Sequence, residues 1–179
     1  MCEVLQVNDA SLRDDAIRNF IAEAKKDIAE GTIVILGGDF NEPSHLDWTR
    51  ETKDLFDHNG LIVPWTVPLL LDNNGFIDTY RELYPDVINY PGFTFPADNP
   101  LIPVEKLTWA PKADERDRID YVFYHPHPAV ELKDAVIFGP RGSIVNSKRM
   151  PEESKDRFLL PLGVWPTDHK GVLVTFRLK

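Results

Sequence analysis

The feature that most constrains the fold is an amphipathic helix pattern that runs directly into a short β-branched segment. The pattern predicts a helix from about residue 12 to residue 30, with Gly31 as its stop. The run TIVILG (residues 32–37) follows at once and has the composition of a strand buried on both faces of a sheet. A helix that leads into a central strand indicates a layered domain of helices and sheet. The apolar positions of the helix are Leu12, Ala16, Ile17, Phe20, Ile21, Ala24 and Ile28.

The rest of the chain predicts a second helix, a short third helix and three strands. Ser44 and Asp47 have the spacing of a capping box, so we expect a helix from His45 towards Asn59 and Gly60. The run WTVPLLLDNNG (65–75) contains proline and a turn cluster and is expected to be irregular, whereas GFIDTYRELYP (75–85) predicts a short helix. The expected strands are IDYVFYH (119–125), VELKDAVIFG (130–139) and KGVLVTFRLK (170–179).

Two longer segments lack any regular pattern. Residues 86–118 carry prolines, glycines and scattered aromatics, which predicts a long surface excursion of the kind that often serves a site. Residues 140–163 are polar and partly basic, and we expect a mobile connection there. The predicted elements are therefore concentrated in the first and last thirds of the chain.

Size and charge narrow the class of protein. With 179 residues and ordinary apolar content, the chain is expected to form one domain over residues 1–179, and no apolar run is long enough to span a bilayer. The formal charge of −9 gives no sign of non-specific nucleic-acid binding, which depends on a surplus of Lys and Arg. The lone Cys2 excludes an internal disulfide. No export signal is present, and the compartment stays unknown.

Polar residues gather at the ends of three predicted strands. Asp39 and Asn41 follow the first strand, Asp120 opens another, and Asp168 and His169 precede the last. Taken singly, each group also fits a structural role: an Asx-type turn, a salt-bridged strand start and a hairpin turn. Together they supply carboxylates, an amide and an imidazole, which can hold a divalent cation, activate a water and neutralise a phosphoryl group.

The order of these groups resembles the endonuclease/exonuclease/phosphatase superfamily, the DNase I-like metal-dependent phosphoesterases. The resemblance rests on GGDFNEPS (37–44), RIDYVF (118–123) and PTDHKGV (166–172), with GFIDTYRELYP between the first two, and runs from the first helix to the C-terminus. It implies an α/β (α+β) fold, a portion of a four-layer α/β/β/α sandwich with a mostly antiparallel sheet and helices on one face.

The resemblance also implies roles for the motif residues. Asp39 would orient and deprotonate the attacking water and help hold the metal, and Asn41 would donate a hydrogen bond to the water or a phosphoryl oxygen. Asp168 would be the other ligand of Mg²⁺ or Mn²⁺, which oxygen ligands suit. His169 would face the phosphoryl group while Asp120 binds its other ring nitrogen, a pairing that raises the imidazole pKa.

The N-terminal part of the family pattern has no counterpart here. In the family, earlier strands supply an asparagine, a glutamate metal ligand and a histidine, whereas only MCEVLQVNDA precedes the first helix of this sequence. We therefore expect the C-terminal part of such a domain, with weak Mg²⁺ binding, poor turnover in isolation and an uncovered sheet face that favours self-association.

Three functions remain open on the sequence alone. A metal-dependent phosphodiesterase, acting on a nuclease-like, phospholipid or sugar-phosphate substrate, fits the resemblance best. A non-catalytic module on the same scaffold could bind a carbohydrate or protein partner, although such a module has no need of all five motif residues. A third reading is a half that works only with a separately encoded N-terminal half.

The remaining aromatic and charged residues have simpler expectations. We expect the other four histidines, His45, His58, His125 and His127, to be solvated loop residues. Trp109 and Trp165 could stack on a ligand or pack at the rim, and Tyr121 is expected to face the core. Arg118 is expected to pair with a nearby carboxylate, with contact to phosphate as the alternative.

Overall fold

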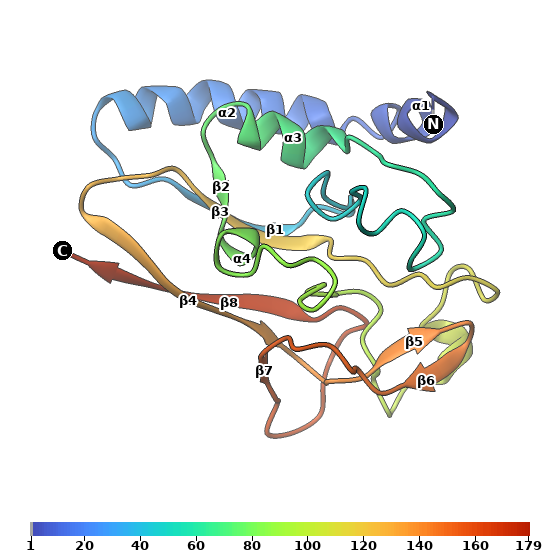
Figure 1. The fold of residues 1–179 in the computed structure, drawn as a ribbon. Coiled ribbons are helices and arrows are strands. Elements are labelled where there is room, and N and C mark those ends of the chain that lie inside the picture. The colour runs from blue at the N-terminus through green and yellow to red at the C-terminus, as the bar shows by residue number, and fades with distance from the viewer. Residues whose placement is uncertain (1) are drawn as a thin grey trace.

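The computed structural model describes residues 2–179 as a mixed α/β structure (Figure 1). The helices are α1 (Cys2–Asp9), α2 (Arg13–Ala29), α3 (Thr66–Asp72), α4 (Thr79–Leu83) and the 3₁₀ turn η1 (Val104–Lys106). The strands are β1 (Ile35–Asp39), β2 (Ile77–Asp78), β3 (Asp120–Tyr124), β4 (Val130–Phe138), β5 (Ser143–Val145), β6 (Lys148–Met150), β7 (Phe158–Leu159) and β8 (Gly171–Leu178). Among the described helices, none has the length and apolar character needed to cross a membrane.

The strands form two three-stranded sheets and a hairpin. In the first sheet β3 lies between β1 and β2, and both pairings are antiparallel. In the second sheet β4 lies between β7 and β8, parallel to β7 and antiparallel to β8. β5 and β6 make the hairpin. The expected mostly antiparallel arrangement and the three expected strands (β3, β4 and β8) are confirmed.

Helices α2 and α3 lie side by side over one face of the first sheet (Figure 1). The alternation of β3 sends Tyr121 and Phe123 into this layer, where both are almost fully buried. The predicted helix 12–30 and the predicted inward orientation of Tyr121 are confirmed. The helical side of this core consists of Ile17, Ile21, Ala24, Val67 and Leu71. A smaller core joins α4 to the second sheet through Tyr80, Ala135 and Ile137.

The prediction that residues 32–37 form a central strand buried on both faces is wrong. Among the described residues β1 is an edge strand, hydrogen-bonded only to β3. Leu36 packs against the helical layer, whereas Ile35 lies on the opposite face and keeps 46% of its surface exposed. A β-branched run therefore marked the strand correctly, but composition alone did not reveal that one of its faces is open.

The predicted helix from His45 to Gly60 is also wrong, because the segment forms successive turns. Side-chain oxygens compete with the helical backbone pattern: Ser44 Oγ accepts from the Leu46 amide at 3.1 Å, and Thr52 Oγ1 donates to the Asp47 carbonyl at 2.5 Å. The backbone then takes positive φ at Phe56, Asp57 and Asn59. The capping-box spacing was real, but no helix followed it.

The segment expected to be irregular, residues 65–75, contains helix α3. Pro68 lies in the first turn of this helix, where backbone amides have no intrahelical acceptor, so proline does not break it. The short helix ended by Pro85 is confirmed as α4, preceded by the two-residue strand β2.

The two patternless segments are more structured than expected. Within residues 86–118 the side chains of Phe93, Thr94, Ala97 and Leu107 are buried, so this segment is not a surface excursion throughout. Residues 140–163 contain β5, β6 and β7. Short strands of two or three residues carry too few positions for a period to be visible in the sequence.

Candidate active site at the strand ends

Three predicted site residues meet where β1 ends and β3 begins. Asp39 is the last residue of β1 and lies opposite Asp120, the first residue of β3, in the antiparallel register. His169 comes two residues before β8. One potential ligand atom from each of the three lies within 4.8 Å of the others. We call Asp39, Asp120 and His169 the site cluster.

His169 is held in place by contacts on two sides. Its Nδ1 lies 3.0 Å from Asp120 Oδ2, which is the pairing that the sequence predicted. The Phe95 ring lies 5.0 Å from the imidazole, and Trp165 Nε1 donates to the His169 carbonyl at 2.7 Å. Because Asp120 engages Nδ1, the ring has Nε2 left for a ligand.

The surroundings of His169 favour its charged form. The hydrogen bond that the imidazole donates to Asp120 raises the imidazole pKa, partial burial opposes that shift, and the charges of Asp120, Asp39 and Asp168 add to it. The imidazole therefore keeps its proton to higher pH than a free histidine does.

Asp39 and Asn41 form a tight local turn. Asp39 Oδ1 accepts from the Asn41 amide and Oδ2 accepts from Asn41 Nδ2, each at 2.8 Å. Asn41 has φ of 49°, a conformation that asparagine tolerates better than most residues. The Asx-type turn considered from the sequence is present, and it coexists with the site cluster.

Asp168 lies next to the site cluster but is not part of it by the same distance measure. Its carboxylate accepts from Thr167 Oγ1 at 3.2 Å, and its carbonyl accepts from the Ala97 amide at 2.6 Å. The structure thus brings Asp120, rather than Asp168, into the close group with Asp39. The ligand role of Asp168 and the catalytic roles of Asp39, Asn41, Asp120 and His169 stay predictions.

Thr94 is hydrogen-bonded to residues in and beside the site cluster, and the sequence did not predict this role. Its side chain is fully buried, and Oγ1 accepts from the amides of Ile119 and Asp120 at 3.0 and 3.1 Å. Its carbonyl accepts from the Lys170 amide at 2.6 Å. One threonine therefore ties the start of β3 to the start of β8, and the only hint in the sequence was a lone hydroxyl between two phenylalanines.

Glu42 fixes the loop that carries Asn41 and was also missed. Its fully buried carboxylate accepts from Asn8 Nδ2 at 2.9 Å and from the Val67 amide at 2.8 Å, and its carbonyl accepts from the Tyr121 hydroxyl at 3.0 Å. Burial raises the pKa of Glu42, and these hydrogen bonds lower it in part. The loop is thereby tied to α1, α3 and β3.

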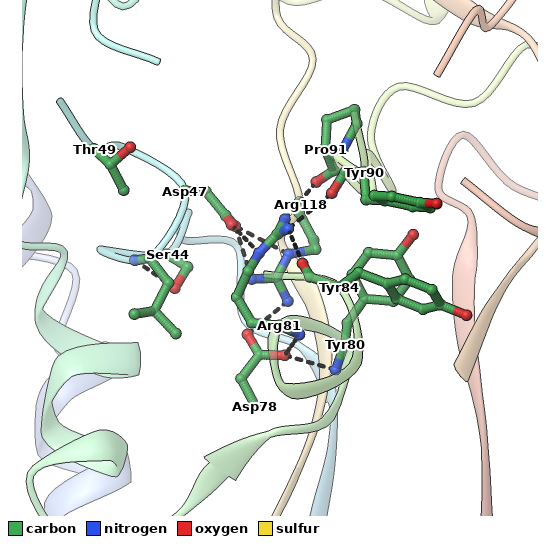
Figure 2. Close-up of polar contacts among 12 residues, drawn as sticks. Ser44, Asp47, Thr49, Asp78, Tyr80, Arg81, Tyr84, Tyr90, Pro91 and Arg118 are labelled. Atoms are coloured by element: carbon green, nitrogen blue, oxygen red, sulfur yellow. Dashed lines mark hydrogen bonds and ion pairs between the residues drawn. The ribbon is translucent and has the colours of Figure 1, made fainter. Parts of the chain in front are cut away.

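A second group of charged side chains is buried in the protein, and Figure 2 shows it. Arg118 Nη2 lies 2.8 Å from Asp47 Oδ2, and Arg118 Nη1 lies 2.6 Å from Asp78 Oδ2. Arg81 Nε donates to Asp47 Oδ1 at 2.8 Å, and its other nitrogens reach the carbonyls of residues 84, 90 and 91. We call Asp47, Asp78, Arg81 and Arg118 the buried arginine cluster.

The contacts of Arg118 in the buried arginine cluster decide between the two roles predicted for it. The predicted carboxylate pairing is confirmed, and the alternative contact with phosphate is wrong because the Arg118 side chain is fully buried. Burial lowers the Arg118 pKa, but the charges of Asp47 and Asp78 outweigh it and the net shift is upward. The guanidinium therefore stays charged, as a structural group.

Two of the remaining expectations concern histidines and tryptophans. His58 is buried and stacks on Trp48 with ring centroids 3.8 Å apart, so the prediction of a solvated side chain is wrong for it. His127 Nε2 contacts the Gly31 carbonyl at 3.1 Å. Trp165 packs against Phe138, whereas Trp109 is 84% exposed.

The donors of the site cluster fit a divalent cation. Two carboxylates and one imidazole face one another, and no lysine or arginine pairs with either carboxylate within 4.0 Å among residues 2–179. A cavity of about 260 Å³ adjoins Asp39, but its lining is mostly apolar, with Leu36 of β1 and Ile17 and Val67 of the helical layer, and includes neither Asp120 nor His169. The carboxylate oxygens suit Mg²⁺ or Mn²⁺, for which water and substrate commonly complete the coordination.

Comparison with known proteins identifies the family. A profile described as the Endonuclease/Exonuclease/phosphatase family matches residues 5–169, so this chain belongs to that family, whose members are commonly hydrolases. The uncharacterized protein F14F9.5 of Caenorhabditis elegans is 33% identical over 147 residues, which are 82% of this chain and 41% of that protein. The chain thus spans less than half of the length of this relative. No solved structure was found to match.

Proposed function

We propose that the protein is a metal-dependent phosphoester hydrolase, most closely suited to phosphodiesters. The observation that carries the proposal is the site cluster, in which Asp39, Asp120 and His169 converge from three separate segments. The family assignment supports the hydrolytic class. The substrate and the identity of the metal are part of the proposal.

Each residue would contribute a distinct property. Asp39 would bind and orient the attacking water and hold Mg²⁺ or Mn²⁺, with Asp168 beside it as a further carboxylate. A bound cation of this kind would neutralise phosphoryl charge and lower the pKa of water. Asp120 holds His169 at Nδ1, which leaves Nε2 to donate to a phosphoryl oxygen, and Asn41 would donate once its amide turns from Asp39.

We further propose that this chain is the C-terminal part of a four-layer sandwich. The open face of β1, with Ile35, and that of β8, with Leu173 at 49% exposed, support this because a covered sheet would bury both. Until it is covered, such a face also favours association with a second copy of the chain. The relative from Caenorhabditis elegans, of which the match covers 41%, leaves room for the other layers.

Metal binding is the first test of the proposal. Millimolar Mn²⁺ or Mg²⁺ should raise the melting temperature of the wild type, because a ligand that binds only the folded state stabilises it. Asp39→Asn should abolish that rise, while the matched control Asp54→Asn, exposed and outside the site cluster, should keep it. A wild type that no divalent cation stabilises would favour a non-catalytic module for a carbohydrate or protein.

Hydrolysis of bis(p-nitrophenyl) phosphate is the second readout. We expect slow, Mn²⁺-dependent turnover that His169→Gln and Asp39→Asn both remove. Turnover at the rate of an intact enzyme would contradict the proposal that the chain is only part of the domain, and turnover that survives both substitutions would contradict the site.

A further inference from the structure

The segment between β7 and β8 is a protruding apolar loop. Residues 158–167 read FLLPLGVWPT and contain no charged side chain. Leu160, Leu162 and Val164 keep 55%, 108% and 71% of their surface exposed. Single exposed apolar residues are ordinary, but three at alternate positions on one loop mark a contact surface. We call residues 160–164 the apolar tip.

Both ends of the apolar tip are anchored. The Leu159 carbonyl accepts from the Gly139 amide at 3.1 Å, as β7 pairs with β4. The Trp165 carbonyl accepts from Asn99 Nδ2 at 2.6 Å, and its ring packs edge-on against Phe138 with centroids 5.1 Å apart. Figure 1 shows the loop hanging free between the end of β7 and the start of β8. The two ends of the apolar tip are therefore fixed to the protein, whereas its exposed side chains pack little against the rest of the protein.

The anchor at Trp165 links the tip to the candidate active site. Trp165 Nε1 donates to the carbonyl of His169, a member of the site cluster, at 2.7 Å. Leu162 precedes Trp165 by three residues, so their Cα atoms are at most about 11 Å apart. The apolar tip and the site cluster are therefore joined through one tryptophan, so that a surface entered by the tip adjoins the part of the chain that carries the site.

We propose that the protein acts on phosphodiesters of amphiphiles at a zwitterionic lipid–water interface, which the apolar tip enters. This inference rests on the proposed phosphodiesterase function and names its substrate class. One molecule, a phospholipid, would satisfy both the charged site cluster and the uncharged tip beside it. The chain charge of −9 disfavours an anionic surface, which would repel it. The tip itself carries no charge that would select a protein partner by electrostatic complementarity.

Vesicle binding tests the proposal without depending on turnover. The whole chain should co-float with phosphatidylcholine vesicles, and more weakly with vesicles rich in phosphatidylserine. Leu160→Ser combined with Leu162→Ser should reduce partitioning by about tenfold or more, because these two exposed leucines would supply most of the apolar area that the lipid buries. Leu178→Ser is the matched control: it is 72% exposed but at the far end of β8, roughly 25 Å along the strand.

Hydrolysis separates this inference from the proposed function. The double variant should keep wild-type Mn²⁺-dependent hydrolysis of bis(p-nitrophenyl) phosphate and lose hydrolysis of phosphatidylcholine in vesicles. Diester hydrolysis without vesicle binding would overturn the substrate class and leave the function standing. Vesicle binding without hydrolysis of either diester would overturn both. A tip that instead mediates self-association, seen as a dimer by light scattering that the double variant makes monomeric, would also overturn the inference.

Discussion

The site cluster and the buried arginine cluster adjoin in sequence, where Arg118 precedes Asp120 by two residues, but they differ in charge balance. The buried arginine cluster contains two arginines and two aspartates, so its formal charges cancel, and its side chains are almost fully removed from water. The site cluster and its neighbour Asp168 contain three carboxylates and at most one positive charge, on His169, and they are partly exposed. One motif, RIDYVF (118–123), contributes to both groups, with Arg118 in the buried arginine cluster and Asp120 in the site cluster.

This difference separates architecture from chemistry. A buried charge is tolerated where partners satisfy it within the protein, so the balanced cluster needs nothing from outside. An excess of carboxylates at a solvent-accessible strand end is unfavourable unless a cation or proton joins them. The buried arginine cluster therefore has a structural role, and the site cluster is the group whose charge favours a bound cation.

Removing one arginine from the buried arginine cluster should have the largest effect on the free energy of unfolding. Arg118→Met leaves Asp47 and Asp78 buried without their shared partner, and we expect a loss of about 3 to 5 kcal/mol in the free energy of unfolding. Urea denaturation followed by fluorescence measures this loss. Arg177→Met is the matched control, because Arg177 pairs with Glu131 at the surface and its removal should change stability much less. Equal effects of the two substitutions would contradict the contrast drawn between buried and exposed charge.

Removing the buried carboxylate that anchors the loop beside the site cluster should have an intermediate effect. Glu42→Ala leaves Asn8 Nδ2 and the Val67 amide without an acceptor, which should cost about 2 kcal/mol in the free energy of unfolding. Glu42→Gln keeps an acceptor oxygen and should cost less. Because burial raises the pKa of Glu42, the wild type should gain stability relative to Glu42→Gln as the pH falls through that pKa.

The Glu42 variants also test whether the loop matters for catalysis. If Glu42 positions Asn41, Mn²⁺-dependent turnover should fall in Glu42→Ala at a temperature where the variant is fully folded, and Glu42→Gln should restore it. A variant that loses stability with full turnover would limit Glu42 to the fold.

The sequence predicted the parts of the molecule that depend on local pattern. The periodicity of residues 12–28 identified α2, and alternation identified β3 and β8. The order of three motifs identified the family and most of the residues that meet at the site. The Asp120–His169 contact, 49 residues apart in sequence, was expected only because the family resemblance supplied it.

What the sequence missed depends on contacts between distant segments. Thr94, Glu42 and the partners of Arg118 have no local signature, because their acceptors and donors lie 25 or more residues away. The error at residues 45–60 has a different cause: side-chain oxygens of Ser44 and Thr52 captured backbone groups that a helix needs. Similarly, the edge position of β1 is a property of the sheet order and not of the strand itself.

The smallest expected effect concerns the titration of His169 in the site cluster. The Asp120 hydrogen bond is the main cause of the raised pKa of His169, so Asp120→Asn should lower that pKa. Asp39→Asn removes only a neighbouring charge and should lower it less. The His169 imidazole signal can be followed by NMR in metal-free buffer and assigned among the five histidines with His169→Gln.

Stability should follow the same titration. Because the folded-state pKa of His169 lies above its unfolded value, the stabilisation from this pairing is fully present at pH below 6.5 and is lost as the pH rises through the folded pKa. The wild type should therefore lose stability over that pH window relative to Asp120→Asn, by far less than Arg118→Met costs. If His169 titrates identically in the wild type and both aspartate variants, the carboxylates of the site cluster do not raise the imidazole pKa. The proposed difference in charge balance between the site cluster and the buried arginine cluster would then have no effect on the residue that faces the phosphoryl group.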